Sequence, residues 1–231
     1  IPQQHHYEIL LRKVDLDGKI ILPTTFIPSA ERYHLMPNID RWVIKNAFIA
    51  YRKLLDINYE HCNFIFSINL SGTSLGDQSL LPFIREQFAK YAIPPASICF
   101  EITETAAIVN LKNTILLFDA LREIGCKFAL DDFGSGMSSF MYLKNFDVDY
   151  LKIDGAFVKE IHQNRIDNAM VRSIHNVAES MNIKTVAEFV ESDAILKQLE
   201  IIGVDYGQGL HLGLPITVKE LIQQYAELHP R

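Results

Sequence analysis

The feature that most constrains the fold of this chain is a regular alternation of short apolar runs with longer segments of helical periodicity. Strands are predicted over residues 7–13, 63–71, 97–104, 126–132, 148–155, the first half of 181–191, and 204–206. Helices are predicted as a short one within 26–33 and longer ones over 37–55, 80–91, the segment that ends at 124, 167–181, 194–203 and 217–228. Strands that alternate with helices along a chain are typical of a parallel α/β architecture.

The number and spacing of these elements narrow the choice among α/β folds. No glycine-rich dinucleotide fingerprint follows any predicted strand, so the pattern favours a (β/α) barrel over an open doubly wound sheet. At 231 residues such a barrel is usually a single domain, and a hydrophobic content of 48% is sufficient for its core. We therefore expect one α/β domain over residues 1–231.

Composition excludes several classes of partner. The formal net charge of −6 argues against a surface that binds a nucleic acid polymer. No apolar stretch is long enough to span a membrane, so we expect no membrane contact by this domain. The start has neither a signal peptide nor an initiator methionine, which predicts a piece excised from a larger protein. Cys62, Cys99 and Cys126 form no CxxC pair and are expected as free thiols in the cytoplasm, whether or not the parent protein is membrane-anchored.

Polar residues follow the apolar runs at the points where the predicted strands end. These residues are Asn69, Glu101, Asp131, Asp132, Lys152, Asp154, Glu188 and Gln208. In a (β/α) barrel the carboxyl ends of the strands form one rim that holds the active site, so we expect these side chains to converge. Taken singly, Asn69 or Asp154 could instead cap a turn, and Glu104 could lie in the first turn of a helix.

The adjacent pair Asp131 and Asp132 points to a cation. Two like charges at the end of an apolar strand cost several kcal/mol each to bury unless a cation compensates them. Oxygen ligands without cysteine suit Mg²⁺ or Mn²⁺, and a pair of such ions is the usual frame for hydrolysis of a phosphate ester. Lys152 could orient the attacking water. The alternative is a Schiff-base lyase with Lys152 as nucleophile, but that chemistry needs an apolar, metal-free pocket, and the number of carboxylates argues against it.

Several motifs, in order and spacing, resemble those of the EAL domain, the bacterial cyclic di-GMP phosphodiesterase. They are YEILLR, FIPSAERYHLMPNIDRWVI, SINLS, FEITE, LDDFGSGMSSF, LKIDGAFV, TVAEFVE and DYGQG. YEILLR is similar to the family's Glu-Ala-Leu-x-Arg segment, with Ile9 in place of the alanine. The resemblance covers essentially the whole chain. It implies a modified TIM (β/α)8 barrel whose first strand is missing from this chain.

The resemblance implies hydrolysis of cyclic di-GMP to linear pGpG with two Mg²⁺ or Mn²⁺ ions, and inhibition by Ca²⁺. The residues that match the family's metal ligands are Glu8, Asn69, Glu101, Asp131, Asp132 and Glu188. The residues that match its catalytic set are Lys152, Glu188, Glu8 and Gln208. Arg12 and Asp154 match substrate-binding positions, and Glu104 matches a glutamate that tethers the loop after the aspartate pair.

The chain departs from the family's usual residues at a few positions. These are Ile9, Ser135, Met137, Phe189 and Leu210. None of these departures removes a ligand. Phe189 stands where a glycine usually follows the metal-binding glutamate, and we expect it to narrow the pocket or to shift Glu188.

The resemblance also implies a homodimer, coupled to the metal site through the glycine-rich loop 134–139, and a parent protein with an upstream sensor or diguanylate cyclase domain. A second class of function stays open, that of a catalytically silent receptor that signals by binding cyclic di-GMP. Silent members usually lack several metal ligands. This chain has all of them, which favours the enzyme.

Overall fold

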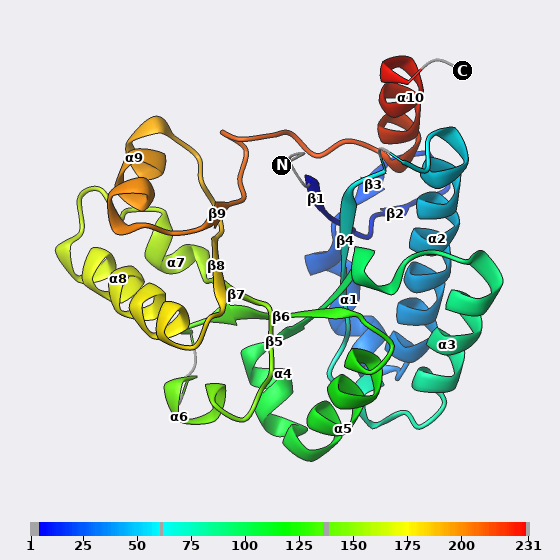
Figure 1. Ribbon diagram of the computed structural model, residues 1–231, viewed down its shortest axis with the longest axis horizontal. Coiled ribbons are helices and arrows are strands. Elements are labelled where there is room, and N and C mark those ends of the chain that lie inside the picture. Colours follow the sequence, from blue (N-terminus) through cyan, green and yellow to red (C-terminus); the bar gives the residue numbers. More distant parts are fainter. Residues whose placement is uncertain (1–4, 61, 136–138, 230–231) are drawn as a thin grey trace. The chain divides into compact units, whose positions relative to one another are not determined.

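The computed structural model describes residues 5–60, 62–135 and 139–229. The backbone forms two compact units (Figure 1). The first contains the chain up to Glu101, then Asn110–Lys127 and the segment from Thr217 onward. The second contains Ile102–Val109 and Phe128–Ile216.

The first unit is built on parallel strands in the order β1 (His5–Glu8), β4 (Phe64–Asn69) and β5 (Ile98–Thr103). Glu8 pairs with Ser67, and Asn69 pairs with Glu101. All of β4 before Asn69 is buried, whereas Asn69 itself is exposed. The register therefore brings polar residues to the carboxyl ends of neighbouring strands.

The helices of this unit cover the strands with apolar side chains. They are α1 (Pro23–Arg32), α2 (Met36–Ile57), α3 (Leu80–Tyr91), α5 (Leu111–Arg122) and α10 (Val218–Leu228), with 3₁₀ turns η1 (Ser74–Gly76) and η2 (Pro95–Ser97). The long helix α2 packs against β4, α3 and α10. Its buried side chains Ile44, Phe48, Tyr51 and Leu54 recur at helical spacing. Full burial of such a side chain stabilises the fold by about 2 kcal/mol.

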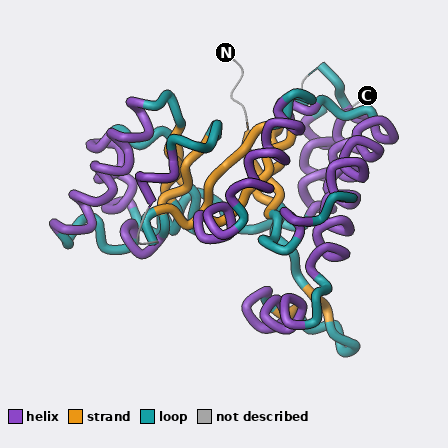
Figure 2. The backbone as a smooth tube through the Cα atoms, turned by 90° about the horizontal axis from the view of Figure 1, so that it is seen from below, coloured by secondary structure: helices purple, strands orange, loops and turns teal. Residues whose placement is uncertain are grey.

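A small hairpin corrects one prediction. The predicted strand over 7–13 ends at Glu8, and Lys13 belongs instead to the antiparallel pair β2 (Lys13–Val14) and β3 (Ile20–Ile21). The Asp15 carboxylate accepts the N–H groups of Asp17 and Lys19, which closes a tight turn and favours this local pairing. Figure 2 shows the hairpin and α1 projecting from the rest of their unit.

The second unit contains parallel strands in the order β6 (Lys127–Phe133), β7 (Tyr150–Ile153), β8 (Lys184–Ala187) and β9 (Tyr206–Gly207). Its helices are α4 (Glu104–Val109), α6 (Ser139–Leu143), α7 (Gly155–Val158), α8 (Arg165–Ser180) and α9 (Asp193–Ile202). Helix α8 lies against β7 and β8 and buries Val171, Ile174 and Ala178 completely. This apolar layer fixes the strands that carry the polar residues described below.

The alternation of parallel strands and helices agrees with the sequence prediction, with two further corrections. The helix predicted to run to Ile124 is divided into α4 and α5 at Asn110, whose amide donates to the carbonyl oxygen of Gly72. An asparagine that bonds elsewhere competes with continuation of a helix. The short helices α6 and α7 were not predicted. Among the described residues, no helix is both long and apolar enough to cross a membrane.

Candidate active site

Two adjacent aspartates occupy an irregularity at the end of β6. Ala129 and Leu130 pair with successive residues of β7, but Phe133 pairs with Ile153, so Asp131 and Asp132 together lie opposite one residue. Asp132 has a left-handed backbone with φ +53°, and its N–H donates to Asp131 Oδ1 at 2.9 Å. Successive side chains of a regular strand point to opposite faces, and a bulge of this kind re-aims one of them. Both carboxylates can therefore serve the same site.

The residue opposite the aspartate pair is Lys152. Its Nζ lies 3.1 Å from Asp131 Oδ2 and 3.0 Å from Glu188 Oε1, and the side chain is almost fully buried. One oxygen from each of Asp131, Asp132 and Glu188 lies within 4.8 Å of the others. These three acids come from the ends of β6 and β8. Surroundings of this kind are the opposite of the apolar pocket that a Schiff-base lysine requires.

The chain on either side of Glu188 is tied to the segment after β9. The Gln208 N–H donates to the Ala187 carbonyl at 2.8 Å, and its carbonyl accepts from Val190 N at 3.0 Å. Gly209 follows in close contact, because a Cβ there would lie 2.3 Å from the backbone N and O of Val190. Half-buried Gln208 is thereby held next to Glu188.

Phe189 takes the place expected of a glycine and does so in a glycine-like backbone conformation, with φ +54°. Its ring is half-exposed and lies against Gly155, where an added Cβ would be 2.1 Å from the ring. The Lys159 ammonium lies 4.1 Å from the ring centroid. The ring therefore covers the start of α7, directly after Asp154.

Asp154 and Glu104 both lie at helix starts in the second unit. Asp154 is the N-cap of α7, and its Oδ1 accepts the Ala156 N–H at 2.8 Å. Glu104 is buried at the start of α4, and its Oε2 accepts the Gly134 N–H at 3.1 Å. The second contact is the kind that a tether to the glycine-rich loop requires. The substrate role of Asp154 and the tethering role of Glu104 stay predictions.

In the first unit, three further residues predicted as ligands lie at neighbouring strand ends. Asn69 Nδ2 donates to Glu8 Oε1 at 2.7 Å, and Asn69 is the register partner of Glu101. Because the amide nitrogen is engaged with Glu8, the amide oxygen is the group that could ligate a cation. Glu101 is 3% exposed. A buried carboxylate beside a second one again suits a site for a hard cation.

The remaining predicted positions are less constrained by contacts. Arg12 lies in the loop after β1, and its guanidinium donates to the Leu11 carbonyl at 2.8 Å. Ile9 continues the pairing of β1 through its N–H to Ser67 O at 2.8 Å. The Ser135 hydroxyl donates to the Asp132 carbonyl, and Leu210 is exposed. Residues 136–138 of the loop, Met137 among them, lie outside the described residues.

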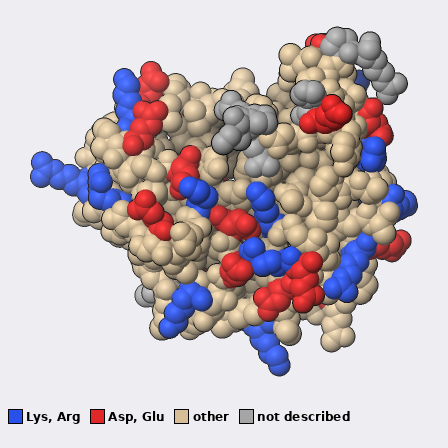
Figure 3. Space-filling view, viewed as in Figure 1, with Lys and Arg blue, Asp and Glu red and all other residues tan. Residues whose placement is uncertain are grey.

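The donor chemistry favours hard cations over thiol chemistry. Cys62, Cys99 and Cys126 form no disulfide, and burial raises the pKa of Cys126 to about 12. Such a thiol is neither a nucleophile nor a ready ligand at neutral pH. On the face that Figure 3 shows, acidic and basic side chains are interspersed over each unit instead of separating by sign. Binding of an anionic ligand would therefore depend on local cations.

Comparison with known sequences gives a consistent result. A family model described as the EAL domain matches residues 2–215. The chain is 44% identical over 223 residues to the cyclic di-GMP phosphodiesterase PdeB of Shewanella oneidensis. The aligned region covers 96% of this chain and 26% of that protein. It is 36% identical over 227 residues to the cyclic di-GMP phosphodiesterase PdeF of Escherichia coli. This aligned region covers 97% of this chain and 29% of that protein. The chain thus spans less than a third of the length of these relatives.

Solved structures agree with the sequence comparison. A structure described as the PaMucR phosphodiesterase in complex with c-di-GMP has a TM-score of 0.85 at 30% identity, and the match covers 93% of this chain and 86% of that one. The FimX EAL domain of Pseudomonas aeruginosa bound to c-di-GMP has a TM-score of 0.84 at 31% identity, covering 91% and 83%. This likeness confirms the predicted α/β fold class, that of the modified TIM barrel.

Proposed function

Because the chain belongs to the EAL domain family, we propose that it hydrolyses cyclic di-GMP to the linear dinucleotide pGpG. The observation that carries the proposal is the buried Lys152 ammonium within 3.1 Å of Asp131 and Glu188, with Asp132 beside them. Cyclic di-GMP phosphodiesterases at 44% and 36% identity over nearly the whole chain support the same reaction.

We propose that two Mg²⁺ or Mn²⁺ ions are held by the acids and the amide named above. Their ligands in this proposal are Glu8, Asn69, Glu101, Asp131, Asp132 and Glu188. When bound, such ions lower the pKa of water and neutralise charge on a phosphodiester. Ca²⁺ should bind the same oxygens but inhibit, because its larger and looser coordination orients the reactants poorly.

Side chains of the chain itself orient the attacking water, accept its proton and contact the substrate in this proposal. In this proposal Lys152 donates a hydrogen bond that orients the attacking water, and the carboxylate of Glu188 or Glu8 accepts the proton that the water loses. Gln208 orients the same water. Arg12 and Asp154 contact the substrate. The water oxygen bonds to phosphorus, one P–O ester bond breaks, and the leaving ribose oxygen takes a proton, which yields a phosphomonoester and a hydroxyl.

Binding without turnover is the alternative function. The FimX EAL domain and the PaMucR phosphodiesterase are both described as bound to c-di-GMP, so recognition of the dinucleotide is the property that these relatives share. Silent members of the family usually lack several metal ligands, whereas this chain has a suitable residue at each proposed ligand position. The enzyme is therefore the function that we favour.

The decisive experiment is incubation with cyclic di-GMP and Mg²⁺ or Mn²⁺, with the products separated by chromatography. We expect pGpG to accumulate, chelator to abolish its formation, and either ion to restore it. Asp131→Ala should lose at least about 10³-fold in turnover, since a missing ligand misplaces a cation. The matched control is Glu200→Ala, an exposed acid on α9. Hydrolysis that survives exhaustive chelation would contradict the proposal.

We further propose that the chain acts within a multidomain parent and as a homodimer. The bifunctional diguanylate cyclase/cyclic di-GMP phosphodiesterase MucR of Pseudomonas aeruginosa, 31% identical to this chain, supports an upstream sensor or cyclase domain. Three cysteines that form no disulfide suit a cytoplasmic location.

A further inference from the structure

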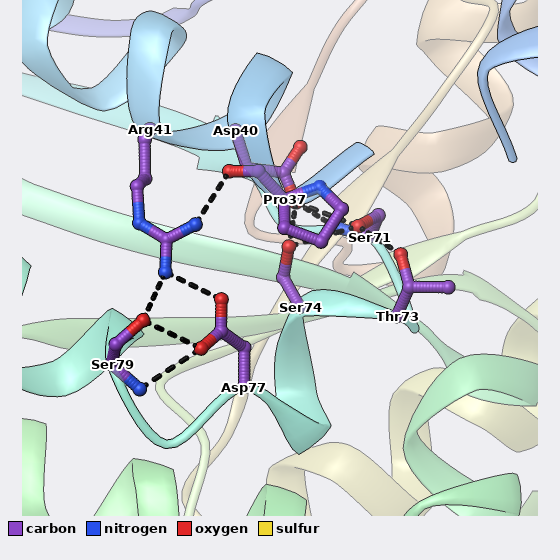
Figure 4. Close-up of polar contacts among 8 residues, drawn as sticks. All are labelled: Pro37, Asp40, Arg41, Ser71, Thr73, Ser74, Asp77 and Ser79. Carbon is purple, nitrogen blue, oxygen red and sulfur yellow. Dashed lines mark hydrogen bonds and ion pairs between the residues drawn. The ribbon is translucent and has the colours of Figure 1, made fainter. Parts of the chain in front are cut away.

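A buried carboxylate on α2 holds the segment that follows β4 (Figure 4). Asp40 is 4% exposed. Its Oδ2 accepts the Ser71 N–H at 2.9 Å, the Ser71 hydroxyl at 2.7 Å and the Ser74 hydroxyl at 2.6 Å. One oxygen therefore anchors both the backbone and two side chains of this segment.

The anchored residue lies two positions after Asn69, the last residue of β4. Between them, Leu70 donates its N–H to the Glu101 carbonyl at 2.8 Å. After β4, the backbone is therefore held by β5 at Leu70 and by Asp40 at Ser71. These contacts fix the backbone from which the Asn69 amide reaches Glu8 Oε1 at 2.7 Å.

The neighbouring residue Arg41 holds the far end of the same segment (Figure 4). Its guanidinium forms an ion pair with Asp77 and donates to the Ser79 hydroxyl at 2.5 Å. The side chains of Arg41 and Asp77 are about a quarter exposed, at 23% and 25%. Arg41 therefore provides a second clamp on the same segment that is remote from Asn69.

An acidic side chain at position 40 is not needed merely to hold the segment after β4 in place. Desolvation raises the pKa of Asp40, and hydrogen bonds from Ser74 and Ser71 and the charge of Arg41 oppose that rise. A neutral acceptor could hold a surface segment without the cost of burying an acid. Hydrogen bonds to an ionised acceptor are shorter and about twice as strong as neutral ones, so a carboxylate restricts the position of Ser71 more tightly.

We propose that Asp40 is a positioning residue for Asn69, which acts through Ser71 to hold the Asn69 amide where it can ligate a cation beside Glu8. This role rests on the metal site of the proposed function. Asp40 itself touches neither the cation nor the substrate. Partners that orient a metal ligand typically change metal affinity by about 10- to 100-fold when they are removed.

The test measures Mn²⁺ affinity by calorimetry in the absence of cyclic di-GMP, with melting temperature recorded alongside. We expect Asp40→Ala to weaken one Mn²⁺ binding step by about 10-fold, and Asp40→Asn, which keeps one acceptor oxygen, to weaken it less. Asp77→Ala removes the remote clamp but keeps the charge of Arg41 near Asp40, so it should lower the melting temperature and leave Mn²⁺ affinity within about twofold. In an Asn69→Ala background, Asp40→Ala should cause no further loss of affinity, because its effect passes through Asn69.

Three results would overturn the role of Asp40. They are an unchanged Mn²⁺ affinity in both Asp40 variants, an equal loss in Asp77→Ala, and full additivity with Asn69→Ala. If Asp40→Ala does not fold, Ser71→Ala removes the hydroxyl donor through which Asp40 is proposed to act, and an unchanged affinity there also contradicts the role. Wild-type protein that binds Mn²⁺ but does not hydrolyse cyclic di-GMP contradicts the proposed function alone, since the same affinity comparison still decides the role of Asp40.

Discussion

At the scale of single residues, the Lys152 ammonium balances the acids of the second unit. It lies 3.1 Å from Asp131 and 3.0 Å from Glu188 and is 2% exposed. At that depth solvent screens the interaction little. A lysine is a compact charge with three donors, so it can both neutralise acids and orient a water. By neutralising the acids, the ammonium weakens the binding of a cation to them. By orienting a water, it supports the proposed reaction at the same site.

Lys152→Met should therefore separate binding from chemistry. Loss of the ammonium leaves the acids more negative, so we expect tighter Mn²⁺ binding. We also expect turnover of cyclic di-GMP to fall by at least about 10²-fold, because the water loses its orienting donor. The melting temperature without divalent ions should fall and should recover when Mn²⁺ is added.

The control for this prediction is Lys184→Met. Lys184 also pairs with an acid, Asp205, but its side chain is 59% exposed. Its loss should leave Mn²⁺ affinity and turnover unchanged. Weaker Mn²⁺ binding in Lys152→Met would show that the ammonium supports the cation site instead of competing with it.

At the scale of elements, the bulge at the end of β6 is what allows two adjacent carboxylates to serve one site. Asp131 and Asp132 lie opposite Lys152 alone, and Asp132 adopts φ +53°. A left-handed backbone is uncommon for residues other than glycine, asparagine and aspartate. The side chain at 132 therefore has to suit the left-handed backbone as well as the proposed cation site.

Substitutions at position 132 should separate these two demands. Asp132→Asn and Asp132→Val both remove a carboxylate, so both should lose turnover. Asparagine tolerates the left-handed region, whereas valine should cost about 1–2 kcal/mol more in the free energy of unfolding. Urea denaturation without divalent ions measures this difference. Equal stability of the two variants would mean that the backbone relaxes out of the left-handed region at no cost.

The same bulge marks the limit of what the sequence could predict of the site. Their places at predicted strand ends indicated that Asp131, Asp132 and Glu188 would cluster, and these three acids do lie together. The strand period of two would have put adjacent aspartates on opposite faces. Nothing in the sequence LDDFG shows which residue leaves the regular pairing, because the bulge is decided by pairing with β7.

At the scale of the whole molecule, the order of strands and helices was predictable, and the contacts between distant segments were not. The apolar periodicity of α2 and α8 gave their places within two residues. The break at Asn110 depends on Gly72, and the anchor at Asp40 depends on Ser71. Each of these pairs is separated by more than 30 positions, so no local pattern contains it.

The free energy of unfolding of the whole chain depends on pH through acids whose pKa is shifted in the folded state. Hydrogen bonds from Ser79 lower the pKa of Asp77. Burial opposes the shift at Asp205, yet bonds from Lys184 and Thr185 leave its pKa lowered as well. A lowered pKa in the folded state means that the unfolded chain binds protons first. The stability from these acids is therefore complete above their ordinary pKa of 3.8 and is lost as the pH falls below it.

Asp205→Asn should consequently make the acid dependence shallower. We expect the free energy of unfolding of the wild type to fall more steeply below about pH 4 than that of the variant. Denaturation series across that range measure both slopes. Asp40, whose pKa is raised, acts with the opposite sign, so its contribution decreases as pH rises. Identical slopes for the two proteins would contradict the assignment to Asp205.

The contact between Phe189 and Gly155 restricts the order in which this sequence can change. The ring occupies the space that a Cβ at position 155 would need, with a separation of only 2.1 Å. A lineage with a side chain at 155 must therefore lose it before it can acquire the phenylalanine. While the ring keeps this place, any side chain at position 155 would require the ring to move. Replacement of Phe189 by glycine would remove the ring from that space, so the residue at 189 determines which residues position 155 can accept.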